Sequence, residues 1–223
     1  MSKQLQSKSP LTKKQIIEMM ELFDSHIGHK KSELEYKNPY TFAVAVLLSA
    51  QATDKSVNLA TKDLFEVADN PASMLNLGLD SLKHYIRTIG LYNAKAKHIM
   101  EMSETLIERF SGHLPHTREE LMQLSGIGRK SANVILNELY GEPTIGVDTH
   151  VLRLTHRLNL VPDSVTTPEA TEQELERIIP DKFKPYVSNY LVLFGRYECK
   201  AKNPNCANCY LKKFCIYNKD SHK

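Results

Sequence analysis

Apolar residues recur at helical spacing along most of this chain of 223 residues. Residues 11–23 carry such a stripe, and residues 42–50 are apolar on every side, which predicts a helix buried all round. Asn38-Pro39 suits the start of that buried helix, because proline is favoured at the first helical position. Residues 41–48 could be misread as a strand, but their length and alanines favour a helix. The pattern therefore predicts an all-α fold.

Capping residues divide the rest of the chain into further helices. Asp54 is a candidate N-cap for a helix whose apolar positions extend to Phe65. Asn70-Pro71 is a second start signal, and Thr117 with Glu120 forms a capping-box pattern before a short helix. Other helices are expected over residues 93–110 with Gly112 at the end, and over 131–140, 151–158, 169–179 and 186–197.

The composition is that of a globular protein, with 41% hydrophobic and 25% charged residues. The formal net charge of +3 is compatible with nucleic-acid binding but does not indicate it. Residues 1–14 are polar and do not resemble a secretion signal. The longest apolar run, residues 42–48, is too short to cross a bilayer. We therefore expect a soluble cytoplasmic protein with no membrane partner.

Residues 124–130 read Leu-Ser-Gly-Ile-Gly-Arg-Lys and join a short helix to the next one through a tight turn. The helix start after Gly126 and Gly128 presents backbone N–H groups and a positive dipole end, which suit a phosphate. The same field and Arg129 favour the neutral amine of Lys130. This segment could hold a DNA backbone and carry an amine nucleophile. The alternative interpretation is an ordinary turn followed by an exposed lysine.

All four cysteines lie near the C-terminus with the spacing C-x6-C-x2-C-x5-C, at Cys199, Cys206, Cys209 and Cys215. Four thiolates this close in sequence can surround one metal centre, either a [4Fe–4S] cluster or a Zn(Cys)4 site. Two disulfides are the alternative, which the missing secretion signal disfavours. Lys200 and Lys202 lie in the loop between the first two cysteines, either as phosphate contacts or as a solvated basic surface.

An aspartate, Asp148, follows in the sequence Gly-Val-Asp-Thr-His. Its position before a helical pattern makes it a good N-cap. A capping carboxylate is held rigidly near a helix start, so the cap is compatible with a catalytic role.

Together these motifs resemble the endonuclease III family of the helix-hairpin-helix DNA glycosylase superfamily. The resemblance rests on the hairpin segment 124–130, Val147-Asp-Thr-His150, the cysteine spacing, Leu47-Leu-Ser-Ala-Gln-Ala-Thr-Asp54 and Thr88-Ile-Gly-Leu-Tyr-Asn93. It extends from about residue 38 to residue 215.

The resemblance implies a two-lobed fold. A six-helix domain would occupy residues 33–142, with the helix-hairpin-helix at about 117–140. Residues 1–32 and 143–223 would form a discontinuous iron–sulfur cluster domain, whose cluster loop is 199–215. One [4Fe–4S] cluster per chain is implied, and DNA would lie across the cleft between the domains.

The resemblance also implies a bifunctional repair enzyme acting as a monomer. It would remove oxidised pyrimidines from duplex DNA and cut the strand at abasic sites by β-elimination. Lys130 would be the nucleophile and Asp148 its essential carboxylate. Gln51 and Leu91 would fill the space left by the extruded base. Gly126, Gly128 and Arg129 would hold a phosphate.

Two rivals remain at the level of sequence. A monofunctional member of the superfamily, such as an adenine glycosylase, lacks the lysine at position 130 and usually carries a further C-terminal domain. A non-catalytic DNA-binding or electron-transfer iron–sulfur protein would leave Lys130 and Asp148 without a role.

Overall fold

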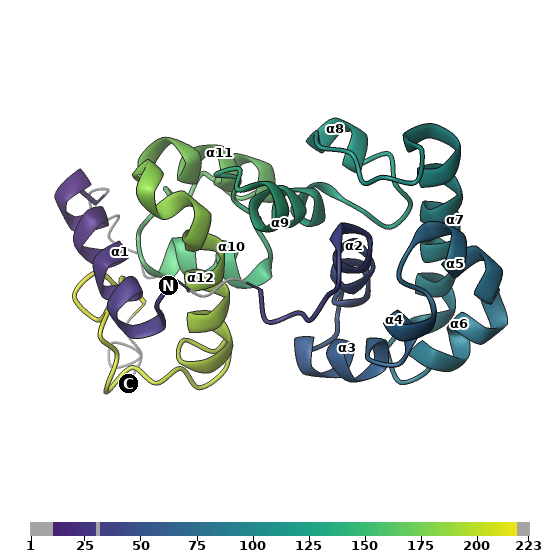
Figure 1. Cartoon of the computed structure of the whole chain (residues 1–223). Coiled ribbons are helices and arrows are strands. Elements are labelled where there is room, and N and C mark those ends of the chain that lie inside the picture. The colour runs from purple at the N-terminus through teal and green to yellow at the C-terminus, as the bar shows by residue number, and fades with distance from the viewer. Residues whose placement is uncertain (1–10, 30–31, 218–223) are drawn as a thin grey trace. The chain divides into compact units, whose positions relative to one another are not determined.

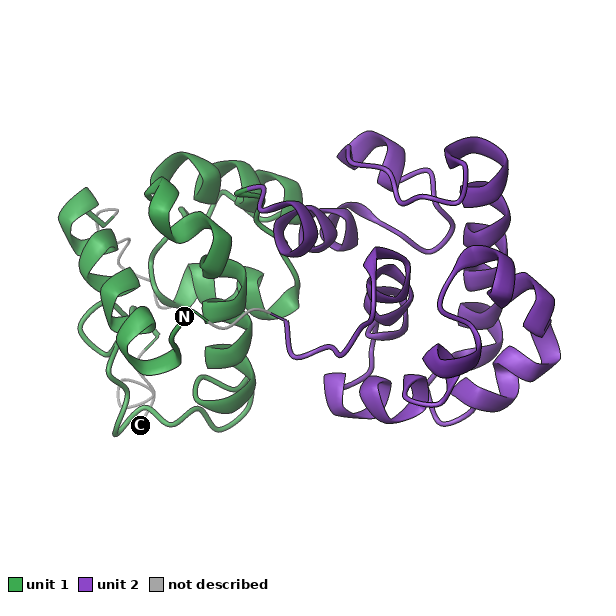
Figure 2. Ribbon diagram, in the orientation of Figure 1, with its two compact units in different colours: residues 1–31, 143–223 green, residues 32–142 purple. Residues whose placement is uncertain are grey.

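The computed structural model describes residues 11–29 and 32–217, and the remaining residues of the chain lie outside that description. These outside residues include 1–10 and 30–31 of the expected cluster domain. Within the described ranges all regular elements are helices and none is a strand, so the expected all-α fold is confirmed (Figure 1). The chain forms two compact units (Figure 2): unit 1 comprises residues 1–31 and 143–223, and unit 2 comprises residues 32–142.

Unit 2 is built around α2, the apolar helix that the sequence predicts to be buried. From Tyr40 to Leu48 every side chain of α2 is buried. Asn38 caps it, accepting from the N–H of Thr41, and Pro39 is its first residue. The helices of unit 2 are α2 Pro39–Leu48, α3 Asp54–Thr61, α4 Leu64–Val67, α5 Pro71–Leu77, α6 Leu79–Ile86, α7 Tyr92–Phe110, α8 Arg118–Leu121 and α9 Arg129–Tyr140.

Unit 1 has its own apolar core, in which aromatic rings are prominent. Phe23 stacks on Tyr190 with ring centroids 5.6 Å apart and meets Phe194 edge-on at 5.5 Å. Tyr210 packs against Phe23 and Phe194, and so attaches the C-terminal loop to this core. The helices are α1 Lys13–Ile27, α10 Thr149–Arg157, α11 Pro168–Ile178, the 3-10 helix η1 Asp181–Phe183 and α12 Lys184–Tyr197.

Two expectations about unit 2 are wrong in detail. Thr53, and not Asp54, is the N-cap of α3, with its hydroxyl accepting from the N–H of Ser56; Asp54 is the first helical residue. The single helix expected from there to Phe65 is divided into α3 and α4. The hydroxyl of Thr61 bonds back to the carbonyl of Val57 in the last turn of α3, a contact that tends to bend helices.

Candidate functional site

The turn between α8 and α9, residues 122–128, is the hairpin turn of unit 2. Leu124 and Ile127 are buried and anchor it, and the N–H of Ile127 donates to the carbonyl of Leu124 at 3.0 Å. Gly126 has a φ of +79°, which a residue with a side chain rarely adopts. The turn therefore has a defined shape, set by two apolar anchors and one left-handed glycine.

The two glycines of the hairpin turn have different surroundings. A Cβ on Gly126 would stand 2.7 Å from Cδ1 of Leu47 and 3.1 Å from Cβ of His98, so the fold itself requires a glycine here. A Cβ on Gly128 would meet nothing within 4 Å. The conformation of Gly128, with φ −93° and ψ 178°, is open to any residue. Internal packing therefore explains Gly126 but not Gly128.

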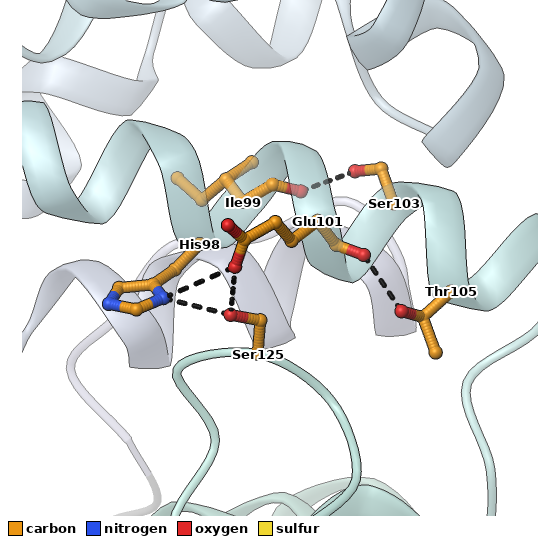
Figure 3. A network of polar contacts seen from close by, with 6 residues as sticks. All are labelled: His98, Ile99, Glu101, Ser103, Thr105 and Ser125. Carbon is orange, nitrogen blue, oxygen red and sulfur yellow. Dashed lines mark hydrogen bonds and ion pairs between the residues drawn. The ribbon is translucent and has the colours of Figure 1, made fainter.

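A polar network attaches the hairpin turn to α7 (Figure 3). The hydroxyl of Ser125 donates to Oε2 of Glu101 at 2.6 Å, and Nδ1 of His98 lies 2.8 Å from the same hydroxyl. His98 and Glu101 also form an ion pair at 3.7 Å when the histidine is protonated. The sequence alone did not indicate these residues. The only available signal was the i,i+3 spacing of His98 and Glu101, which puts them on one helix face.

The start of α9 carries the predicted cations. The helix begins at Arg129, two residues earlier than expected, so Arg129 and Lys130 both lie in its first turn. Arg129 is half-buried and Lys130 is exposed. Gly128, the N-cap, has no side chain with which to satisfy the first N–H groups. The site thus combines helix-start N–H donors with two cations, an arrangement that suits an anion.

Gln51 and Leu91 lie in two exposed loops of unit 2 and share an unusual backbone conformation. Gln51 has a φ of 57° and Leu91 a φ of 58°, the left-handed region that side chains disfavour. Leu91 is the N-cap of α7, and its side chain is 64% exposed. An apolar side chain held outward on a strained backbone is typical of a functional position.

Asp148 lies in unit 1 and is the N-cap of α10, as its sequence context predicts. Its Oδ1 accepts from the N–H groups of His150 at 2.8 Å and Val151 at 2.9 Å. The carboxylate is half-buried and fixed by these two bonds. Lys130 belongs to the other unit.

The four cysteines of unit 1 line one pocket, together with apolar neighbours such as Leu158 and Phe194. Burial raises the pKa of Cys215 to about 11, and the facing cysteines contribute to this rise. Burial also raises the pKa of Cys209, again with contributions from neighbouring cysteines. Among the described residues, no three Cys, His, Asp or Glu side chains stand close enough together to hold a single metal ion.

Arg157 of α10 holds the first part of the cysteine loop, residues 199–215. Its guanidinium donates to Sγ of Cys199 at 3.3 Å, to the carbonyl of Lys200 at 2.9 Å and to that of Ala201 at 3.2 Å. It also stacks over the ring of Tyr217 at 3.9 Å. Lys200 and Lys202 are exposed, with the backbone of Lys200 fixed by Arg157.

None of the described helices is long and apolar enough to cross a membrane.

Comparisons with known proteins define the class of this chain. The profile of the HhH-GPD superfamily of base excision DNA repair proteins matches residues 44–181. The chain therefore belongs to this superfamily. Within it, the chain is 44% identical to endonuclease III of Haemophilus influenzae over 93% of its length and 97% of that protein. It is 48% identical to endonuclease III of Rickettsia felis, over 89% of its own length and 92% of the relative.

A solved structure agrees with these relatives. The structure of a trapped endonuclease III–DNA covalent intermediate superposes with a TM-score of 0.89 and 38% identity. The match covers 96% of this chain and all of that chain. The resemblance to the endonuclease III family stated from the motifs is confirmed.

Proposed function

We propose that this chain is a DNA glycosylase and abasic-site lyase that removes oxidised pyrimidines from duplex DNA. The observation that carries the proposal is the exposed Lys130 in the first turn of α9, directly after the hairpin turn, in a chain of the base excision repair superfamily. An amine can displace a base and then cut the strand, whereas an activated water can only displace the base. The lysine therefore favours the bifunctional reaction over a monofunctional one.

Lys130 is the proposed nucleophile. Its neutral amine attacks C1′ of the deoxyribose, the C1′–N bond breaks, and the base leaves with the bonding electrons and takes up a proton. Opening of the sugar ring gives an imine between Nζ and C1′. The imine acidifies the C2′ protons, so loss of one expels the 3′ phosphate and breaks the strand. Arg129 and the helix start favour the neutral amine at the beginning of this sequence.

Asp148 is the proposed catalytic carboxylate. It accepts the proton that the amine loses and stabilises the positive charge that develops on the sugar. Its two bonds to the N–H groups of His150 and Val151 fix the carboxylate, so that no reorientation is needed during the reaction.

DNA binding is assigned to three parts of unit 2. The hairpin turn, through Gly126 and Gly128, and Arg129 hold a phosphate at the start of α9. Gln51 and Leu91 enter the stack from which the damaged base is extruded. In unit 1, Lys200 and Lys202 supply further phosphate contacts.

The cysteine loop is proposed to hold one [4Fe–4S] cluster, with Cys199, Cys206, Cys209 and Cys215 as ligands. The fit is supported by four thiols that line one pocket and by the guanidinium of Arg157 at Sγ of Cys199, since N–H donors stabilise coordinated thiolates. A centre with four thiolate ligands fixes the loop and, with it, Lys200 and Lys202. The chain is proposed to act as a monomer in the cytoplasm, where duplex DNA is its substrate.

Borohydride trapping tests the proposed reaction. The protein is incubated with a duplex that contains one oxidised pyrimidine, and borohydride reduces any imine to a stable protein–DNA adduct. We expect an adduct with wild type and with Lys62→Ala, which removes an exposed lysine of the same unit. We expect none with Lys130→Ala, and a rate lower by at least about a hundredfold with Asp148→Asn.

The outcomes separate the alternatives. Base release without an adduct would identify a monofunctional glycosylase. Binding without base release would identify a non-catalytic DNA-binding protein. Strand cleavage by Asp148→Asn at the wild-type rate would remove the carboxylate from the mechanism.

A further inference from the structure

The C-terminal end of α2 lies inside unit 2, where Ser49 and Ala50 supply donors to every carbonyl of the last turn except that of Leu48. The last carbonyls of any helix lack partners within the helix, and a buried carbonyl without a partner is costly. Leu48, the last residue of α2, is fully buried. The helix has no basic residue in its last turn. The donor therefore comes from another element.

That donor is Lys95 of α7. Its Nζ donates to the carbonyl of Leu48 at 2.9 Å and to the carbonyl of Ala50 at 2.6 Å. The cation also suits the negative end of the α2 dipole. One ammonium group thus ends the helix and fixes the first residues of the loop that follows.

Lys95 is an unusual residue for this position, because it is only 5% exposed. Burial lowers the pKa of Lys95, which reflects the cost of removing the ammonium from water. Capping by a neutral side chain or by ordered water would avoid that cost. The buried cation therefore indicates that the loop after α2, and not only the end of the helix, needs a fixed conformation.

Lys95 also contacts the second exposed loop of unit 2. Its backbone N–H donates to the carbonyl of Leu91 at 3.1 Å, in the first turn of α7. Its side chain reaches the carbonyl of Ala50, directly before Gln51. Leu91 and Gln51 are two of the three described non-glycine residues of unit 2 with a left-handed backbone, and both are exposed. Position 95 therefore contacts both loops, but only the bond to the carbonyl of Ala50 depends on the lysine side chain.

We propose that Lys95 is a positioning residue whose ammonium holds Gln51 in the conformation from which it enters the DNA stack beside Leu91. The inference deepens the proposed function and rests on the assignment of these two residues as the space-filling wedge. Lys95 does not touch DNA. Its ammonium fixes the carbonyl of Ala50, directly before Gln51, and Lys95→Met removes this bond while keeping the backbone bond to Leu91.

A double-mutant cycle tests this role. The measured quantity is the Kd for a duplex with a non-cleavable abasic-site analogue, relative to undamaged duplex. Lys95→Met is expected to weaken the preference for the abasic duplex roughly tenfold. In a Gln51→Ala, Leu91→Ala background the same change is expected to cost less than about twofold, because the residues through which it acts are gone. The same loss in both backgrounds would overturn the proposal.

The control is Ser103→Ala, on the same pair of helices. Ser103 is fully buried in α7 and pairs with the hydroxyl of Tyr40 at 2.6 Å, in the first turn of α2. Its loss removes a buried contact between α2 and α7 without touching either wedge loop. We expect a lower melting temperature for Ser103→Ala and unchanged discrimination of the abasic duplex.

A second variant, Lys95→Arg, tests the proposal in case Lys95→Met does not fold. Lys95→Arg keeps the charge and N–H donors but moves them, and it is expected to fold and to show a smaller loss with the same dependence on background. Equal discrimination by wild type and Lys95→Arg, where Lys95→Met does not fold, would overturn the positioning role. If wild type itself does not prefer the abasic duplex, this result contradicts the proposed function and, with it, the inference that rests on it.

Discussion

The hairpin turn of unit 2 and the cysteine loop of unit 1 are both short irregular segments, and both are anchored in the same way. Each has two buried apolar residues three positions apart, Leu124 with Ile127 and Leu211 with Phe214. They differ in their polar side chains. Ser125 of the hairpin turn pairs with side chains of α7, whereas the four cysteines of the loop line one pocket.

The hairpin turn and the cysteine loop are therefore expected to be stabilised in different ways. The hairpin turn is shaped by the polypeptide alone, through a left-handed glycine, two anchors and a polar tether. The geometry of the cysteine loop is expected to depend on a metal centre, because the binding free energy of a metal contributes to the folding of the segment that holds its ligands.

Cys209→Ala is expected to have the largest effect. We expect iron to fall from about four atoms per chain to near zero and the absorption at roughly 400 nm to disappear. Hydrogen exchange should become fast in residues 199–215 and stay slow in the hairpin turn, because only the cysteine loop depends on the metal. Elemental analysis, absorption and exchange spectra provide the readouts.

The control for this change is Asn208→Ser, an exposed position between the two central cysteines. It should retain iron, colour and slow exchange. A colourless wild-type protein with one zinc would contradict the cluster assignment. Slow exchange of residues 199–215 in Cys209→Ala would contradict the contrast between the two sites.

Substitutions of the two glycines of the hairpin turn are expected to have intermediate effects on stability and on DNA binding. Gly126→Ala should destabilise unit 2 by about 1–2 kcal/mol for the left-handed conformation alone, with a further cost from Leu47. Gly128→Ala should leave the melting temperature nearly unchanged, because reduced entropy of the unfolded chain offsets a poorer N-cap. Gly128→Ala should still weaken DNA binding by at least about threefold, because its methyl group lies where a phosphate approaches.

Thermal melting and DNA titration of both variants check this prediction. Normal DNA affinity in Gly128→Ala would show that the open side of this glycine is not a phosphate site. A large loss of stability in the same variant would show that the turn needs both glycines for folding.

The smallest effect on stability is expected at Leu91. Leu91→Gly relieves a left-handed conformation that costs about 1–2 kcal/mol, and this gain is partly offset by the entropy of glycine in the unfolded chain. Ser111→Gly at the other end of α7 is the matched control, because Ser111 has a φ of 53°. Both variants should melt at or slightly above the wild-type temperature, and only Leu91→Gly should lose discrimination of the abasic duplex. Equal discrimination in the two variants would remove Leu91 from the wedge.

Local signals in the sequence were sufficient for much of the fold. Asn38, Thr117 and Asp148 cap helices as their contexts predict, because a cap depends on residues only two or three positions away. The apolar run that forms α2 was recognisable for a similar reason. The helix α6 was not predicted, since it begins after Gly78 without a capping side chain.

The contacts that hold the loops of the candidate site in place could not be predicted from local signals. Ser125 meets Glu101 across 24 positions of sequence, and Lys95 reaches Leu48 across 47. Such pairs depend on how helices pack, and no local pattern records them. The catalytic roles of Lys130 and Asp148 come from the family resemblance, whereas the metal centre was predicted from the cysteine spacing; all of them stay predictions.

The first turns of α7 limit the kinds of sequence change that this protein can tolerate. Leu91 is the N-cap of α7, and Lys95 and His98 lie three positions apart on one side of the helix, so that the three residues serve three separate loops. A single inserted residue within that span would rotate everything after it by about 100°. Substitutions in these turns can therefore be absorbed one loop at a time, but an insertion or deletion would detach several loops at once. The length of this segment should vary less than its composition.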